Sequence, residues 1–237
     1  MLTTGCRSRF FFWWIASLFA LVSASAQTSP DLDRVLSQMD VQAKAFRSAE
    51  ANFVWNQYTK VVDENDTQTG KVYYRRQGSE VQMAADILEA NGHPEPRTVL
   101  YEDGKVQMYQ PKIDQITVYN TAKNKAEVES FLVLGFGGGG HDMLKAFDVK
   151  YLGSEKIGDT PTDKLDLTPK NPKVRSLFPH IVLWIDPQRG ISLQQQLFQP
   201  SGDYRLAKYS DIQLNQKVPD SAFKLKTTSK TQTVSQG

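Results

Sequence analysis

The chain has 237 residues, with 28 Lys and Arg against 26 Asp and Glu, and 40% of its residues are hydrophobic. This near balance of charge argues against nucleic acid as a partner, because domains that bind nucleic acid carry a marked excess of positive charge. The single cysteine, Cys6, lies in a segment that we expect to be removed, so the mature chain is expected to have no disulfide, catalytic thiol or cysteine metal site.

The N-terminal segment is typical of a secretory signal peptide. Arg7 and Arg9 give it a positive start, residues 10–22 form an apolar run of 13 residues, and an Ala-Ser-Ala cleavage site ends at residue 26. The run is shorter than the ~20 residues that span a bilayer, although an uncleaved anchor is an alternative. We expect residues 1–26 to be removed, leaving 26 basic and 26 acidic residues in a periplasmic protein.

The mature chain begins with one helix and continues mainly as strands. Residues 31–48 place apolar side chains at three- and four-residue spacing, which predicts an amphipathic helix. In most of the remaining chain, apolar and polar side chains alternate with a period of two, which predicts strands. Polar loops are expected over residues 63–69 and 88–96. The expected strands cover residues 52–62, 70–76, 80–84, 97–102, 106–109, 115–119, 149–158, 161–168, 180–186, 191–199, 204–214 and 223–225.

The sharpest local pattern lies between residues 97 and 119. Asp103-Gly104 separates two alternating runs and predicts a two-residue hairpin turn. Leu100, Met108 and Val118 are expected to face one apolar hollow.

An apolar insertion with a run of glycines interrupts the strands. Residues 123–134 and 141–147 are expected to be helical, and Gly137, Gly138, Gly139 and Gly140 lie between them. Four consecutive glycines lose much backbone entropy on ordering. They indicate either a loosely ordered loop between two core helices or the hinge of a lid over an apolar cavity.

Together these elements predict an α+β domain over residues 27–226. About eleven antiparallel strands should curl into one strongly curved sheet, with the helices covering its concave apolar face. Residues 227–237 are rich in Ser, Thr and Gln and are expected to be disordered.

Catalytic motifs are weak in this sequence. Residues 135–140 formally match G-x-G-x-x-G, but an expected helix precedes them and no βαβ unit surrounds them. His93, His141 and His180 are far apart and have no carboxylate at metal-ligand spacing. We therefore expect no metal, no cofactor and no enzyme activity, with an exported enzyme as the least favoured alternative.

Two groups of residues resemble the family of the outer-membrane lipoprotein carrier protein LolA. One is the hairpin described above, and the other is a series of strand ends and turns in the C-terminal third. The matching residues are Asp103, Gly104, Lys105, Tyr109, Pro111 and Gln115 in the first group, and residues 167–170, 185–190 and 209–215 with Phe223 in the second. Their common order extends the resemblance over nearly the whole mature chain.

The resemblance implies an open, incomplete β-barrel whose apolar concave face is covered by helices. It implies a periplasmic, monomeric carrier that binds acylated lipoproteins or lipid. It also implies an inner-membrane lipoprotein-releasing transporter as donor and an outer-membrane acceptor. A lipid- or lipoprotein-sensing regulatory module on the same fold is the alternative.

Arg76 matches the family arginine that latches the lid in its closed state. Gln77 replaces the proline that usually follows in the family, so an exposed strand-end arginine is an equal alternative. Apolar period and aromatic size suggest the residues that line the lipid cavity, although each could instead belong to a closed core and a one-residue slip would swap the faces. These residues are Phe46, Phe53, Trp55, Met83, Leu100, Met108, Val118, Phe131, Leu134, Leu144, Phe147 and Trp184.

Overall fold

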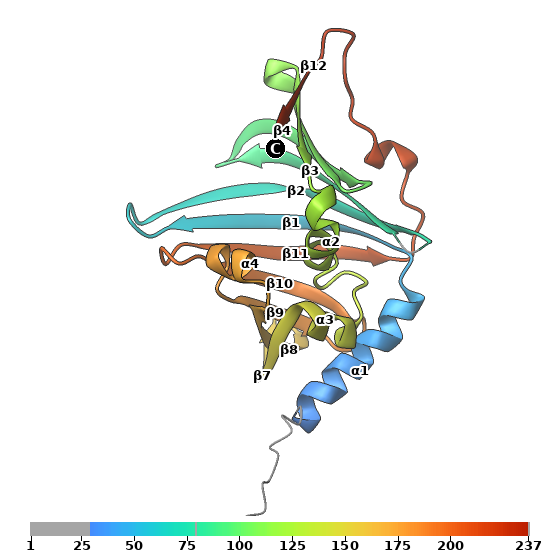
Figure 1. The fold of residues 1–237 in the computed structure, drawn as a ribbon, viewed down its shortest axis with the longest axis vertical. Coiled ribbons are helices and arrows are strands. Elements are labelled where there is room, and N and C mark those ends of the chain that lie inside the picture. Colours follow the sequence, from blue (N-terminus) through green and yellow to red (C-terminus); the bar gives the residue numbers. More distant parts are fainter. Residues whose placement is uncertain (1–28, 79, 237) are drawn as a thin grey trace, which may run out of the picture.

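The computed structural model describes residues 29–78 and 80–236 (Figure 1). The expected signal peptide, residues 1–26, lies outside the described residues. The described strands form one sheet of twelve, in the order β12-β6-β5-β4-β3-β2-β1-β11-β10-β9-β8-β7. Their bounds are β1 Ser48–Thr59, β2 Glu64–Gln77, β3 Glu80–Ala90, β4 His93–Glu102, β5 Lys105–Gln110, β6 Gln115–Asn120, β7 Phe147–Ile157, β8 Thr160–Pro169, β9 Ile181–Asp186, β10 Ile191–Phe198, β11 Tyr204–Leu214 and β12 Gln232–Gln236.

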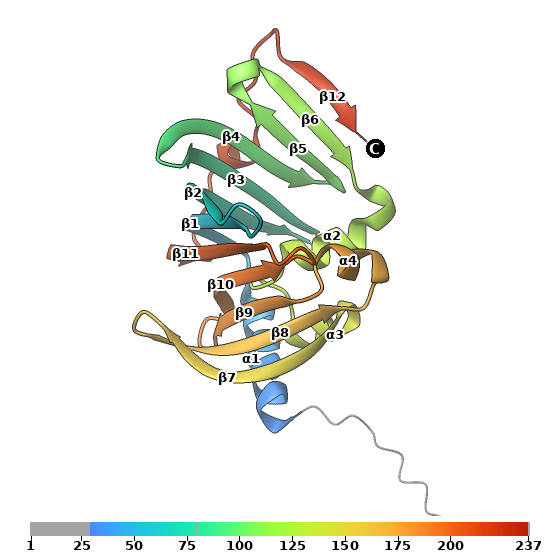
Figure 2. The same ribbon diagram turned by 90° about the vertical axis from the view of Figure 1, so that its left-hand side faces the viewer.

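The sheet consists of two antiparallel meanders that meet in the middle. Strands β1 to β6 run outward in one direction and β11 to β7 in the other, with β1 paired to β11. The terminal strands β12 and β7 have no pairing with each other, so the sheet is open. Figure 2 shows the sheet curving around α2, α3 and α4. The expected α+β class with an open, curved sheet is confirmed.

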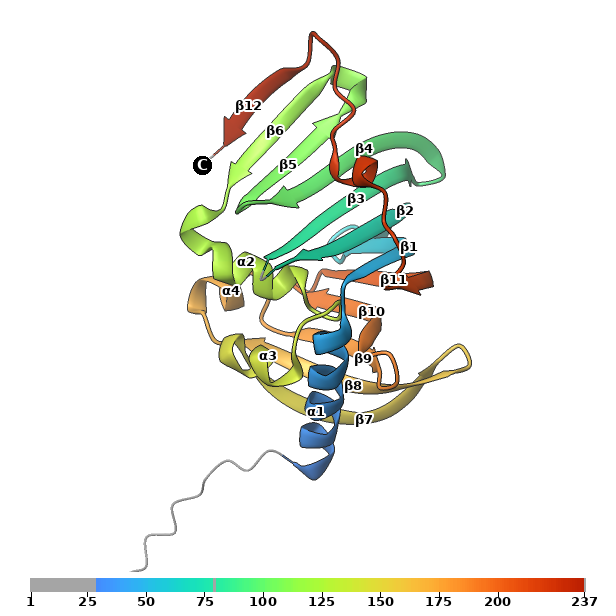
Figure 3. The ribbon, with the colours of Figure 1, turned by 90° about the vertical axis from the view of Figure 1, so that its right-hand side faces the viewer.

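Four described α-helices accompany the sheet: α1 Pro30–Ala45, α2 Lys125–Leu132, α3 Gly140–Ala146 and α4 Pro172–Leu177. We call the face on which α1, α2 and α3 pack the inner face (Figure 3). The start of α1 follows from its sequence, because the Ser29 side chain accepts a hydrogen bond from the Leu32 amide and Pro30 occupies the first turn. Its buried stripe then packs onto the apolar side chains of β7, β8 and β9.

An ion pair fixes the polar side of α1 to the sheet. The Arg34 guanidinium donates two hydrogen bonds of 3.1 Å to the Asp163 carboxylate of β8. Asp163 is only 3% exposed, so the paired charge replaces the water that the carboxylate loses. Removing Arg34 alone would therefore leave the buried Asp163 carboxylate without its cation.

The apolar side chains form two clusters on the inner face and a smaller one on the outer face. One inner cluster joins α1 to β7, β8 and β9, and the other lies over β1, β2 and β3. The outer cluster places Val218 and Phe223, from the segment after β11, on Ala84 and Leu100. This end of the sheet is thus apolar on both faces.

The Asp103-Gly104 turn is as predicted. Both residues have positive φ, 50° and 68°, and Glu102 pairs directly with Lys105 across the two-residue loop. Such backbone angles match the twist of the flanking strands, which explains the preference for Asp-Gly here.

Several expected boundaries were wrong. Most of residues 63–69 and 88–96, expected as loops, belong to the long hairpins β1–β2 and β3–β4. Residues 223–225 form no strand, because Asp220–Phe223 is a turn of 3₁₀-helix. Helix α4 was not anticipated.

The expected disorder of residues 227–237 is also wrong for most of the segment. Gln232–Gln236 forms β12, which pairs in parallel with β6 and covers that edge of the sheet. Thr228 and Thr231 both donate hydrogen bonds of 2.6 Å to the Asp114 carboxylate. Backbone pairing and these contacts need no apolar side chains, so composition did not indicate them.

Candidate functional site

A mostly apolar cavity of about 740 Å³ lies between the inner face of the sheet and the helices α2 and α4. We call it the main cavity. Strands β1, β10 and β11 supply its floor, and Tyr209, whose pKa is raised by burial, keeps a neutral hydroxyl there. Its lining residues are Trp55, Val106, Val128, Phe131, Leu132, Lys173, Val174, Leu177, Phe178, Gln195, Leu197, Arg205, Ala207 and Tyr209.

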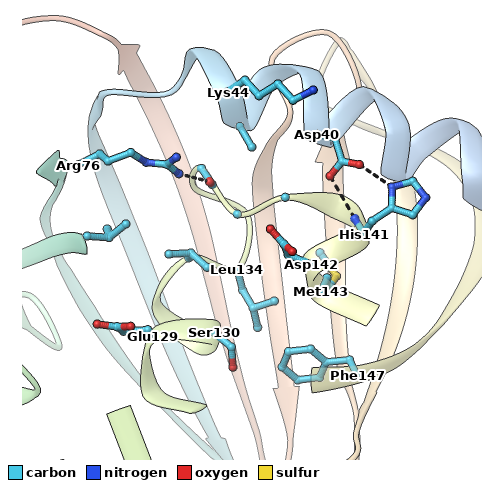
Figure 4. Close-up of a pocket in the computed structure, with 16 residues that line it drawn as sticks. Asp40, Lys44, Arg76, Glu129, Ser130, Leu134, His141, Asp142, Met143 and Phe147 are labelled. Carbon is cyan, nitrogen blue, oxygen red and sulfur yellow. Dashed lines mark hydrogen bonds and ion pairs between the residues drawn. The ribbon is translucent and has the colours of Figure 1, made fainter. Parts of the chain in front are cut away.

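Two further cavities lie beside the main cavity. One of about 400 Å³ shares Phe131 and Val174 with it, and one of about 660 Å³ shares Ser130 and Phe147 with the 400 Å³ cavity. The 660 Å³ cavity, shown in Figure 4, is bordered by α1, α2 and α3 and contains more charged groups. The three cavities therefore surround α2, and movement of this helix would change all of them.

Arg76, the residue matched to the family latch, contacts the glycine run. Its Nη2 donates a hydrogen bond of 2.6 Å to the Gly137 carbonyl oxygen (Figure 4). Its guanidinium lies 5.8 Å from the centre of the Phe46 ring. The Nε of Arg76 is buried and has no hydrogen-bond partner among the described residues. The end of β2 is thus tied to the link between α2 and α3.

Two more hydrogen bonds attach the same link to β10. The Gln195 side-chain amide donates to the Leu134 carbonyl oxygen at 2.6 Å, and the Ser192 backbone amide donates to the Gly135 carbonyl oxygen at 2.8 Å. Both carbonyls belong to the link, beyond the last residue of α2, Leu132. The sheet therefore supplies hydrogen-bond partners for the backbone of the link.

Phe136 anchors the link. It is fully buried, stacks on Tyr74 at 4.7 Å between ring centres, and meets Tyr209 edge-on at 4.9 Å. Aromatic pairs in these geometries stabilise beyond the area that they bury. Because Tyr209 also borders the main cavity, the anchor and the cavity share a wall.

Close packing explains why some of residues 137–140 are glycine. Gly137 has φ of 79°, and a Cβ there would lie 2.3 Å from the Phe46 ring. A Cβ on Gly140 would lie 2.3 Å from the Leu36 carbonyl oxygen of α1. A Cβ on Gly139 would approach only the ends of flexible carboxylates, at 3.0 Å and more. At least two of the four positions therefore require glycine in this closed arrangement.

An ion pair joins α3 to α1 at the other end of the glycine run. The His141 ring contacts the Asp40 carboxylate (Figure 4). Its other nitrogen lies 3.4 Å from the Asp33 carboxylate. The hydrogen bond to Asp40 raises the pKa of His141, because it favours the charged imidazolium. The contact is strongest when His141 is protonated.

The structure places most of the expected cavity residues on the inner side. Trp55 and Phe131 line the main cavity, and Leu134 and Phe147 line the 660 Å³ cavity. The others on this side belong to the apolar clusters or pair with residues that do. They are Phe46, Phe53, Met83, Met108 and Leu144.

Three expected cavity residues lie on the outer face instead. Leu100 is buried under Val218 and Phe223, and Val118 shares its face because both pair with Gln107. Met108 points to the opposite face, so the expected grouping of these strands around one hollow is wrong. Trp184 also faces outward, where its indole donates to Glu155 at 3.0 Å and Lys164 lies 4.7 Å from its ring.

Sequence reasoning missed much of the main cavity. Lys173, Val174, Leu177 and Phe178 belong to α4 or follow it, and six residues are too few for a helical period. One indication was present, because Asn171 caps this helix and Pro172 occupies its first position. The remaining missed residues, on α2 and on β5, β10 and β11, required the register of the sheet. They are Val106, Val128, Leu132, Gln195, Leu197, Arg205, Ala207 and Tyr209.

Comparison with known proteins identifies similar folds. No protein-family model and no curated protein matches this chain. A crystal structure of MucB aligns with a TM-score of 0.52 at 14% identity, over 83% of this chain and 63% of that one. An uncharacterized conserved protein from Thermus thermophilus aligns at 0.55 and 12% identity, over 87% and 99%. The Mycobacterium tuberculosis lipoprotein LppX aligns at 0.50 and 12% identity, over 81% and 99%.

At these identities the likeness concerns the fold alone. The open, curved sheet with helices on its inner face is the architecture that the sequence resemblance implied. Within residues 29–78 and 80–236, no helix is long and apolar enough to cross a membrane. Across the same residues, no group of three or more His, Cys, Asp and Glu side chains could hold a metal ion.

Proposed function

We propose that this protein is a periplasmic carrier that binds the acyl chains of lipoproteins, or lipid, in the main cavity. The observation that carries the proposal is an apolar cavity of about 740 Å³ between a curved sheet and a short helix followed by the glycine run. Its size falls within the range of small-molecule binding sites. The role is binding and release, without a chemical step.

The energetics of an acyl chain suit such a role. Burying a chain contributes ~0.8 kcal/mol per CH₂, so ~14 carbons offer on the order of 10 kcal/mol before the costs of binding. That is enough to keep the chain out of water. Release then requires that the cavity open or that an acceptor compete for the chain.

Helix α2 and the link to α3 are the proposed lid. The Arg76 hydrogen bond is the proposed latch, and residues 137–140 are the proposed hinge. Because the same segment touches all three cavities, its displacement would open a path for an acyl chain. Because Phe136 belongs to this link, opening would also separate its ring from those of Tyr74 and Tyr209.

The proposed carrier would act as a monomer between two membranes, with its N-terminal 26 residues serving for export. An inner-membrane lipoprotein-releasing transporter would load it, and an outer-membrane protein would accept the cargo. The alternative is a regulatory module that senses lipid or lipoproteins. MucB, which shares the fold, was crystallised in complex with MucA.

A transfer assay separates the carrier from the sensor. Purified protein is mixed with inner-membrane vesicles that contain a radiolabelled lipoprotein and the releasing transporter, and soluble label is measured. A carrier is expected to release lipoprotein into a soluble complex with this chain. If the protein binds acyl chains but releases no lipoprotein, the carrier role is wrong and the sensor remains.

A further inference from the structure

Arg205 brings a positive charge into the main cavity. It lies on β11, paired with Leu197 of β10, and its guanidinium carbon is 5.8 Å from the centre of the Trp55 ring and 5.9 Å from that of Phe178. Its Nε is buried and has no hydrogen-bond partner within the described chain. No described carboxylate forms an ion pair with it.

The cavity has a second cation and no acid. Lys173 of α4 also lines it, and no ion pair of Lys173 occurs in the part of the chain that the structure describes. All the other lining residues are uncharged, and no Asp or Glu is among them. The cavity therefore combines a large apolar surface with two positive charges that the described residues do not balance.

The other inner-face arginines differ from Arg205. Arg34 makes two hydrogen bonds to Asp163, Arg76 donates to the Gly137 carbonyl oxygen, and Arg97 of β4 forms an ion pair with Glu95. A guanidinium beside apolar surface costs free energy unless its charge and donors are matched. Its planar set of five donors fits a carboxylate or a phosphate. Arg205 is thus the one of these inner-face arginines that has no hydrogen bond or ion pair to any described residue.

We propose that the main cavity binds an anionic amphiphile, with its carboxylate or phosphate at Arg205, supported by Lys173, and its acyl chain against the apolar wall. This inference rests on the proposed acyl-binding function and deepens it by naming the headgroup. A cation at the cavity selects for acyl ligands that carry a negative charge. Neutral lipids of the same chain length bind more weakly.

The test compares ligands that differ in charge alone. Displacement of a fluorescent acyl probe from delipidated full-length protein is measured with palmitate and with hexadecanol, which has the same chain and no charge. Lysophosphatidylglycerol is a third ligand that distinguishes a phosphate headgroup from a free carboxylate. The variants are Arg205→Met and, as a control, Lys208→Met, which removes an exposed cation from the outer face of the same strand.

The wild-type protein and Lys208→Met are expected to bind palmitate, lysophosphatidylglycerol or both at least about tenfold more tightly than hexadecanol. Arg205→Met is expected to lose this preference while its hexadecanol affinity stays the same, which also shows that the cavity is intact. If Arg205→Met does not fold, the affinities of the wild-type protein are measured at low and high salt instead. Added salt should weaken binding of the anionic ligand and leave the hexadecanol affinity unchanged.

Other outcomes overturn the proposal. Equal affinity of the wild type for charged and neutral ligands removes the headgroup site and leaves acyl binding in place. Equal loss of all ligands in folded Arg205→Met assigns the residue a structural role only. If no ligand displaces the probe from the wild type, the proposed acyl-binding function fails as well.

Discussion

Two adjacent arginines on β2 have different contacts because their side chains point to opposite faces of the sheet. Arg76 points to the inner face and donates to Gly137, whereas Arg75 points outward, pairs with Asp220 and lies 4.3 Å from the Phe223 ring centre. The two side chains have the same charge and neighbouring positions. One is therefore a matched control for the other.

We expect Arg76→Gln to speed the release of an acyl ligand about fivefold, because a net hydrogen bond contributes ~1 kcal/mol. Stopped-flow dissociation of a fluorescent acyl probe measures the rate. Arg75→Gln should leave the rate unchanged, since its contacts lie on the other face. Equal rates for wild type and Arg76→Gln would refute the latch.

At this scale, alternation predicted which residues of one strand share a face but not how the faces of neighbouring strands match. Leu100 and Val118 share the outer face, whereas Met108, which was grouped with them, lies on the inner face. The outer face beneath Val218 and Phe223 is also apolar. Trp184 lies in β9, which is buried on both sides. Without a polar face, the sequence contains no marker of orientation.

Among the elements, the link between α2 and α3 combines rigid and adjustable positions. Gly140 packs against the backbone of α1, which cannot retreat without moving the helix. Gly139 approaches only the side chains of Asp40 and Asp142. Alanine substitutions at Gly139 and Gly140 therefore test hinge flexibility and close packing separately.

Gly140→Ala is expected to lower the free energy of unfolding by roughly 1–3 kcal/mol, because the added methyl overpacks the contact with Leu36. Gly139→Ala should change stability little, since carboxylates can move and alanine reduces the entropy of the unfolded chain. Urea unfolding measures both. If residue 139 acts in the hinge, Gly139→Ala also slows probe exchange; a destabilised Gly139→Ala or a neutral Gly140→Ala would contradict this division.

Elements with a strong local pattern were predicted well, and those fixed by distant partners were not. Helix α1 and the Asp103-Gly104 hairpin carry their own caps, periods and turn residues. Helix α4 has too few residues for a period, and β12 exists only because β6 offers an edge to pair with. Their positions depend on the assembled sheet.

For the whole molecule, the open sheet explains why a cavity exists. An open sheet of twelve strands leaves an inner face that the helices cover only in part. The sequence predicted the curved sheet and helical cover, but the cavity wall draws on residues from α2, α4 and four strands. Register and curvature bring these together.

The central claim is that an acyl chain occupies the main cavity. Ala207 lies on the cavity floor beside Trp55, and Leu206 is its neighbour on the outer face of β11. A large side chain at Ala207 should fill the space that the ligand needs, whereas the same side chain at Leu206 should not.

The most direct test is the amount of acyl ligand bound per protein, measured by mass spectrometry after loading Ala207→Trp, Leu206→Trp and the wild type with the same lipid. The wild type and Leu206→Trp are predicted to bind acyl lipid, and folded Ala207→Trp to bind little or none. Equal acyl lipid in both variants, or none in the wild type, would contradict the assignment of this cavity.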